Sequence, residues 1–78
     1  MHIEIVTPDA TLFQGEATYV FLPGSDGSLG IMKNHAPLIS SLKKGTLRIK
    51  DQAGKEMKFE VKGGTVEVMK NKVVVLAE

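Results

Sequence analysis

Residues 46–69, TLRIKDQAGKEMKFEVKGGTVEVM, alternate apolar and polar side chains in three short runs. The runs span residues 46–50, 57–62 and 65–69. A period of two places one apolar face inward and one polar face outward, which is typical of antiparallel sheet. Between the runs, Asp51–Gly54 has the composition of a hairpin turn, and the pair Gly63 and Gly64 indicates a bulge or a tight bend. The stretch therefore predicts strands rather than helices.

The segments on either side of this stretch continue the pattern. Asn71 stands where a short hairpin loop needs a left-handed residue, and Val73–Leu76 is an apolar run that predicts a strand buried on both faces. Toward the N-terminus, three more strands are predicted, around residues 2–5, 11–13 and 16–22. Short strands separated by turn residues predict one all-β domain over residues 1–78, built as a sandwich or a barrel.

Composition narrows the class of protein. The chain has 78 residues, enough for one domain, and it has no cysteine, so neither a disulfide nor a thiolate metal site is expected. The formal net charge of +1 lacks the basic surplus of a dedicated nucleic-acid binder. No apolar run approaches the roughly 20 residues that span a bilayer, and the first residues lack the pattern of a signal peptide. We therefore expect a soluble domain in a reducing, cytosol-facing environment.

The Gly-rich stretch Pro23–Gly30, PGSDGSLG, is the most unusual part of the sequence. A phosphate-binding loop would need Lys and then Ser or Thr after its last glycine, at the start of a helix, whereas Ile31 and Met32 follow here. The stretch instead fits a hairpin with positive φ angles, which lets the backbone lie close to a neighbour. We therefore predict a contact surface rather than a phosphate-binding loop.

Apolar residues are in excess between residues 17 and 39. Tyr19 and Phe21 lie on one face of their predicted strand, and Val20 and Leu22 lie on the other, so both faces are apolar. Because a two-layer fold has only one interior, part of this surface predicts an interface. The alternative is that the strands are central and that loops cover their second face.

The candidate chemical groups are few. Only His2 could join His35 as an imidazole ligand, and their spacing carries no metal signal, so a structural or interface role is predicted for His35. The serines have no acid–histidine constellation in the sequence, so no nucleophile is predicted. Lys70 follows Met69 near a predicted hairpin tip and weakly resembles the modified lysine of biotinyl and lipoyl carrier domains. A carrier domain modified at Lys70 is therefore the alternative function.

Taken in order, the motifs resemble one family along nearly the whole chain. The matching segments are Ile5-Val6-Thr7-Pro8, Leu12-Phe13-Gln14-Gly15-Glu16, Leu22-Pro23-Gly24-Ser25-Asp26-Gly27-Ser28-Leu29-Gly30-Ile31, His35-Ala36-Pro37-Leu38, Lys44-Gly45-Thr46-Leu47-Arg48-Ile49, Gly63-Gly64-Thr65-Val66-Glu67-Val68 and Asn71-Lys72-Val73-Val74-Val75-Leu76-Ala77. The family is the N-terminal domain of the epsilon subunit of F-type ATP synthases, called delta in mitochondria. The resemblance implies a flattened antiparallel β-sandwich of about ten short strands.

The same resemblance implies a mechanical role rather than catalysis. Members of the family belong to the central stalk of the rotary motor. One side packs on the gamma subunit, and the end near the Gly-rich loop rests on the membrane-embedded c-ring. The chain would dock gamma to the ring and couple ion-driven rotation to ATP synthesis, as a peripheral subunit on the cytoplasmic side of a bacterial inner membrane. No cofactor, metal, nucleic acid or directly bound ATP is expected.

Two contact surfaces follow from the resemblance, residue by residue. The loop expected to face the c-ring comprises Gly24, Ser25, Asp26, Gly27, Ser28, Leu29, Gly30, Ile31 and Met32. The residues expected to face gamma are Thr7, Tyr19, Phe21, His35 and Leu38.

The sequence departs from the family pattern in two places. Many bacterial members carry an acidic residue at the position of Ser28, so an ionic contact with the ring would be lost or moved to Asp26. The sequence reaches Leu76-Ala77-Glu78 where the family's C-terminal helical hairpin begins. That hairpin carries the family's inhibitory movement and, in some members, ATP binding, and neither activity is expected here.

Overall fold

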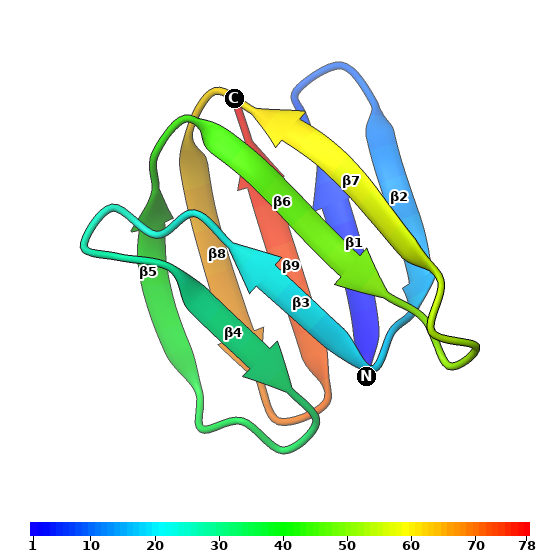
Figure 1. Ribbon diagram of the computed structural model, residues 1–78. Coiled ribbons are helices and arrows are strands. Elements are labelled where there is room, and N and C mark those ends of the chain that lie inside the picture. Colours follow the sequence, from blue (N-terminus) through cyan, green and yellow to red (C-terminus); the bar gives the residue numbers. More distant parts are fainter.

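Nine strands and no helix make up the fold, in a computed structural model that describes residues 1–78. The strands are β1 (His2–Val6), β2 (Thr11–Glu16), β3 (Tyr19–Leu22), β4 (Leu29–Met32), β5 (Leu38–Leu42), β6 (Gly45–Lys50), β7 (Glu56–Val61), β8 (Gly64–Met69) and β9 (Lys72–Ala77). They form two layers, sheet A with β1, β2, β5, β8 and β9 and sheet B with β3, β4, β6 and β7 (Figure 1). The all-β sandwich is confirmed, with nine strands where about ten were expected. The chain forms no helix with the length and apolar character needed to cross a bilayer.

Strands β1 and β9 lie side by side in the middle of sheet A. The strand order is β2-β1-β9-β8-β5 in sheet A and β4-β3-β6-β7 in sheet B. Strands β1 and β9 run parallel, with His2 opposite Lys72 and Val6 opposite Leu76, whereas every other neighbouring pair is antiparallel. Alternation within a segment predicts a strand but not its neighbours, so the sequence pattern does not predict this parallel pair.

The interior between the two sheets is filled by apolar side chains alone. Fifteen buried residues form one cluster, comprising Ile3, Ile5, Ala17, Val20, Leu22, Ile31, Leu42, Leu47, Ile49, Val61, Val66, Val68, Val73, Val75 and Ala77. Burial of one Val, Leu or Ile side chain contributes about 1.5–3 kcal/mol. At one side of the sandwich, Phe13 on β2 and Phe59 on β7 pack with ring centroids 5.9 Å apart. The alternation in residues 46–69 therefore gives the correct inward faces of β6 and β8.

The β6–β7 turn follows the sequence prediction, whereas the β8–β9 turn does not. Asp51–Gly54 closes the β6–β7 hairpin, with Gly54 at a φ of 84° and the Asp51 side chain accepting hydrogen bonds from the Ala53 and Lys55 amides at 3.0 and 2.9 Å. The prediction for Asn71 is wrong, because the only non-glycine residue with positive φ is Asn34, at 67°. The β8–β9 turn is instead held from outside, by a hydrogen bond from the Asn34 amide to the Lys70 carbonyl at 3.2 Å.

Two predicted strands differ from the observed ones. Val73–Leu76 is not buried on both faces, because nothing covers the outer face of sheet A and Leu76 is 53% exposed there. The predicted strand over residues 16–22 is interrupted at Ala17 and Thr18, where the chain crosses from sheet A to sheet B. The crossing is fixed by hydrogen bonds from the Ala17 amide to Met1 and from the Thr18 amide to Lys50.

The predicted bend at Gly63 and Gly64 is confirmed as the crossing from β7 in sheet B to β8 in sheet A. Their φ angles are 142° and 135°, a conformation that residues with a side chain rarely adopt. A Cβ on Gly64 would also collide with the Leu76 carbonyl oxygen and approach the Ala77 Cα to 3.1 Å. Gly64 therefore lets β8 start in direct contact with β9.

We expect Gly64→Ala to destabilise the fold far more than Gly27→Ala, although the two glycines have nearly equal φ angles of 135° and 136°. A Cβ at Gly27 meets open space, so that variant should lose only about 1–3 kcal/mol from backbone strain. At position 64 the β9 backbone must also move, and we expect a loss on the order of 4 kcal/mol or more. Urea unfolding of both variants measures the difference. Equal losses would show that the contact with Leu76 is unimportant.

Candidate docking surfaces

The outer face of sheet A carries uncovered apolar side chains. Ile39 on β5 is 75% exposed, Leu76 on β9 is 53% exposed and Met69 on β8 is 36% exposed. Val74 is half-buried and lies on the same face of β9 as Leu76. We call Ile39, Met69, Val74 and Leu76 the apolar band. Large exposed apolar side chains that gather on one face of a small domain indicate a contact site.

The apolar band is uneven and includes polar positions. Glu67 on β8 lies in register between Ile39 and Val74, and Thr65 lies opposite Leu76. A hollow of about 370 Å³ adjoins the β5 end of the band. It is lined by Pro37, Leu38, Ile39, Glu67, Val68 and Met69. A depression with an apolar floor beside a carboxylate can receive a side chain from a partner protein.

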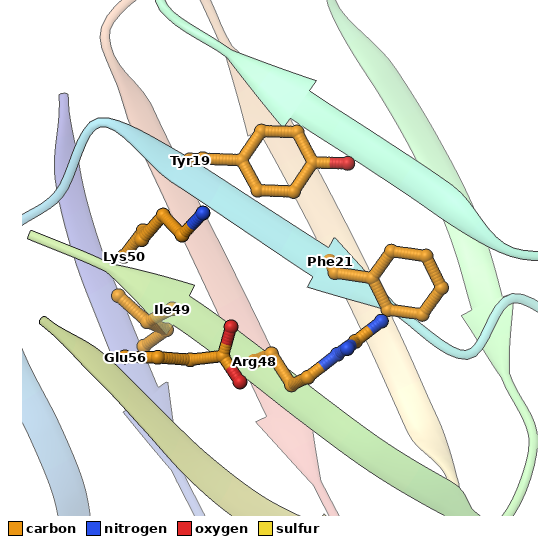
Figure 2. Close-up of a pocket in the computed structure, with 6 residues that line it drawn as sticks. All are labelled: Tyr19, Phe21, Arg48, Ile49, Lys50 and Glu56. Carbon is orange, nitrogen blue, oxygen red and sulfur yellow. The ribbon is translucent and has the colours of Figure 1, made fainter. Parts of the chain in front are cut away.

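The outer face of sheet B is polar by comparison. The Arg48 guanidinium on β6 lies over the ring of Phe21 on β3, 4.4 Å from the ring centroid (Figure 2). The Thr46 hydroxyl donates a hydrogen bond to the Glu60 carboxylate at 2.9 Å. The Tyr19 hydroxyl lies against Gly30, where a Cβ would have no room. The two aromatic side chains are thus half covered by neighbouring strands and by an arginine.

The Gly-rich loop between β3 and β4 is anchored at its root and exposed at its tip. Gly24 forms a bridge with Leu42 of β5, which joins the two sheets at this corner. The Ser25 amide donates to the Ser41 carbonyl at 3.0 Å, and the hydroxyls of the same two serines lie 2.9 Å apart. Residues 25–28 are exposed, and Gly27 has the positive φ that the sequence predicts for this loop. The loop is therefore a firmly held projection.

Two residues of the predicted ring-facing loop, Gly24 and Ile31, are buried and cannot contact a partner directly. Ile31 is 1% exposed and belongs to the core, because strand alternation turns it inward. Gly24 is buried at the root of the loop, with its Cα beside the Gly27 carbonyl. The predicted set is corrected to the seven remaining residues, Ser25, Asp26, Gly27, Ser28, Leu29, Gly30 and Met32.

The five residues predicted to face gamma do not share one surface. Tyr19 and Phe21 belong to the outer face of sheet B, whereas Leu38 is on β5 of sheet A. The Thr7 hydroxyl accepts hydrogen bonds from the Asp9 and Ala10 amides in the β1–β2 turn. His35 lies in the β4–β5 loop, and its Nδ1 donates to the Ala36 carbonyl at 2.7 Å. No single flat partner could contact all five.

Three members of the apolar band, Met69, Val74 and Leu76, lie on the C-terminal hairpin and were not predicted as surface residues from the sequence. The signal was present in the run Val73–Leu76, whose alternate positions belong to opposite faces of β9. The prediction that the whole run is buried does not show that Val74 and Leu76 point outward.

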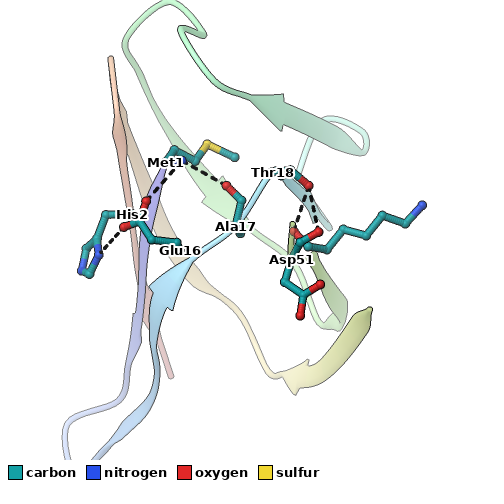
Figure 3. Close-up of polar contacts among 7 residues, drawn as sticks. Met1, His2, Glu16, Ala17, Thr18 and Asp51 are labelled. Carbon is teal, nitrogen blue, oxygen red and sulfur yellow. Dashed lines mark hydrogen bonds and ion pairs between the residues drawn. The ribbon is translucent and has the colours of Figure 1, made fainter. Parts of the chain in front are cut away.

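A set of polar contacts fixes the first residues to the crossing between the sheets (Figure 3). The Met1 amino group donates to the Ala17 carbonyl at 3.0 Å and lies 3.7 Å from the Glu16 carboxylate. The His2 Nδ1 lies 3.2 Å from Glu16. The Thr18 hydroxyl donates to the Lys50 carbonyl at 3.2 Å. These contacts tie β1 and β2 to the end of β6, which stiffens the link between the two layers.

The remaining candidate groups do not form a chemical site. No three His, Asp or Glu side chains are placed to hold a metal ion. Lys70 is exposed on the two-residue β8–β9 turn, and its carbonyl accepts the hydrogen bond from Asn34.

Comparison with known proteins places the chain in a family. The family model for the β-sandwich domain of the ATP synthase delta/epsilon chain matches residues 1–78. An ATP synthase epsilon chain from Desulforamulus reducens is 49% identical over 76 residues, which is 97% of this chain and 57% of the relative. Another from Chlorobium limicola is 45% identical over 97% of this chain and 86% of the relative. The chain thus spans little more than half the length of most of the relatives it matches.

The fold recurs in a solved structure. A chain in the mitochondrial ATP synthase of Euglena gracilis superposes with a TM-score of 0.90, at 18% identity, over 96% of this chain and 48% of that one. At this identity the likeness concerns the fold alone. The family match over the whole sequence carries the assignment: the chain belongs to the family of the ATP synthase delta/epsilon chain β-sandwich domain.

Proposed function

We propose that the chain is a non-catalytic subunit of the central stalk in a bacterial F-type ATP synthase. It docks the gamma subunit to the c-ring and so couples ion-driven rotation to ATP synthesis, peripheral to the inner membrane on its cytoplasmic side. The observation that carries the proposal is the apolar band, an uncovered docking face on a domain of the epsilon-chain family. The family match over residues 1–78 gives no support to the carrier-domain alternative at Lys70.

The apolar band is our proposed contact with gamma. Of the predicted gamma-facing residues, Leu38 packs against the core but lines the hollow beside Ile39, and His35 lies in the loop that precedes β5. Thr7 follows β1 in the same sheet. Tyr19 and Phe21 belong to the opposite layer, so we leave them out of the proposed gamma surface. A partner seated on sheet A would bury the apolar side chains that the isolated domain leaves in water.

The tip of the Gly-rich loop is our proposed contact with the c-ring. Residues 25–28 are exposed, and their hydrophilic side chains suit the polar loops of a membrane ring. Anchoring of the loop root through Ser41 and Leu42 would let it transmit force without bending. Antiparallel pairs across both sheets give the stiffness that a mechanical coupling element needs.

Reconstitution tests the proposed function. The 78-residue chain would be added to membranes carrying the same organism's ATP synthase depleted of epsilon, and ATP-driven proton pumping would be measured. We expect the chain to bind gamma and to restore pumping. Absence of gamma binding by a chain shown to be folded would refute the docking role.

Asp26→Lys is expected to reduce the restored pumping by at least about half, because it reverses the only acidic charge of the exposed loop tip. The fold should be unaffected, since the Asp26 side chain is exposed and forms no ion pair. Gln52→Lys, in the exposed β6–β7 hairpin, is the control and should pump like the wild type. Equal pumping by both variants would show that the loop does not meet the ring.

A further inference from the structure

A cationic row crosses the outer face of sheet B. Phe21 on β3 pairs in register with Arg48 on β6, and Arg48 pairs with Lys58 on β7. Residues directly opposite each other on one face of an antiparallel pair lie close together, and like charges there destabilise the sheet. The neighbouring row, by contrast, joins Thr46 to Glu60 by a hydrogen bond of 2.9 Å. The row that pairs Arg48 with Lys58 contains no carboxylate of its own.

The carboxylates of the chain leave Arg48 unneutralised. None of the five ion pairs in the protein includes Arg48. Lys58 has one carboxylate neighbour, Glu56, at 4.0 Å, with the Lys58 side chain 66% exposed. An exposed pair at that distance contributes little. Both cations are thus available to a ligand.

Phe21 holds the guanidinium of Arg48 in place. The guanidinium carbon lies 4.4 Å from the ring centroid, a distance at which a cation is attracted to an aromatic face. Figure 2 shows the guanidinium end turned toward Phe21 and the Lys50 amine turned the other way, toward Tyr19. Attraction to the ring restrains the guanidinium of Arg48, and a restrained guanidinium favours paired hydrogen bonds to an oxyanion.

A hollow lies beside the two cations. Its volume is about 530 Å³, and it is lined by Phe21, Pro23, Thr46, Arg48, Lys58 and Glu60. Phe21 and Pro23 form an apolar wall, and Arg48 and Lys58 supply two positive charges. Glu60 contributes one negative charge, held by Thr46 in the neighbouring row. The side chains that line the hollow carry a formal charge of +1, and the hollow has room for a small molecule.

We propose that this hollow binds a small oxyanion of the phosphate class, either free phosphate or a small phosphate monoester. A doubly charged oxyanion would neutralise Arg48 and Lys58 together, and the apolar wall would accept the organic part of a monoester. The site lies on sheet B, whereas the proposed gamma contact lies on sheet A. The inference therefore stands independently of the docking role.

Binding is measured by NMR titration of the ¹⁵N-labelled 78-residue chain at constant ionic strength, with inorganic phosphate in one arm and phenyl phosphate in the other. We expect saturable shifts at the amides of Phe21, Arg48 and Lys58. Arg48→Met and Lys58→Met should each weaken binding about fivefold or more, since each removes one charge-assisted contact. Lys70→Met removes a positive charge from the distant β8–β9 turn and should bind like the wild type.

The two arms distinguish the sources of the phosphate group. Tighter binding of phenyl phosphate identifies a monoester, and equal binding identifies free phosphate. Without ligand, Lys58→Met should be at least as stable as the wild type, because it removes the like-charge pair. Shifts that do not saturate, that spread evenly over the exposed lysines, or that persist unchanged in both Arg48→Met and Lys58→Met would overturn the proposal.

Discussion

Ile31→Asp is expected to abolish folding of the domain. The side chain is 1% exposed and lies opposite Val20, which is fully buried, in the β3–β4 pair. The change removes apolar burial of about 1.5–3 kcal/mol and places a carboxylate where no buried polar group exists to pair with it. A domain of this size has a total stability of about 5–15 kcal/mol at most, so the combined loss should leave it unfolded. Far-UV circular dichroism and urea unfolding measure the effect.

Met32→Asp is the matched control for this prediction. Met32 is the next residue of the same strand, but it points outward and is 62% exposed. The same carboxylate there remains in water, so we expect a folded domain whose stability changes by no more than about 0.5 kcal/mol. A cooperative unfolding transition of Ile31→Asp near that of Met32→Asp would contradict the burial assigned to Ile31.

Ile39→Lys is expected to weaken gamma binding by at least about tenfold while leaving the domain folded. Ile39 is 75% exposed, so the isolated domain loses almost no apolar burial. Glu67 lies directly opposite on β8 and can pair with the new ammonium group. In the proposed complex, however, a charge at the most exposed point of the apolar band must be desolvated against an apolar partner. Titration of purified gamma by calorimetry gives the affinity, and circular dichroism verifies the fold.

The control for Ile39→Lys is Met32→Lys. It makes the same kind of exchange on an exposed apolar residue, but in sheet B. We expect it to bind gamma with the affinity of the wild type. If Met32→Lys weakens binding and Ile39→Lys does not, gamma binds sheet B, and the proposed face is wrong.

The local pattern of the sequence predicts most of the strands, but neither β4 nor β5, and it does not predict the environment of the strands. Alternation identifies Leu47, Ile49, Val66 and Val68 as inward residues because the side-chain period of a strand is independent of its neighbours. The same rule could not show that Leu76 is exposed, since exposure depends on whether another layer covers the sheet. The turn residues also predict only part of the structure. They identify the Asp51–Gly54 hairpin, but they place the left-handed residue at Asn71 rather than at Asn34.

The candidate surfaces likewise depend on contacts between strands that the alternation within one strand does not predict. The Gly-rich loop was identified from its composition, yet the burial of Ile31 depends on its pairing with Val20 on another strand. The cationic row of Arg48 and Lys58 arises because the β6–β7 register brings two residues from separate runs together. Such sites depend on tertiary pairing, which the pattern of a single strand does not contain.

The parallel pairing of β1 with β9 has a consequence for biosynthesis. Within this domain, His2 is synthesised early and its partner Lys72 is synthesised late. Sheet A therefore has a gap at its centre until β9 has emerged, with one side of β1 and of β8 unpaired. Contacts this distant in sequence close slowly. Sheet B, made from residues 19–61, can form first and serve as a template on which the later strand completes the sandwich.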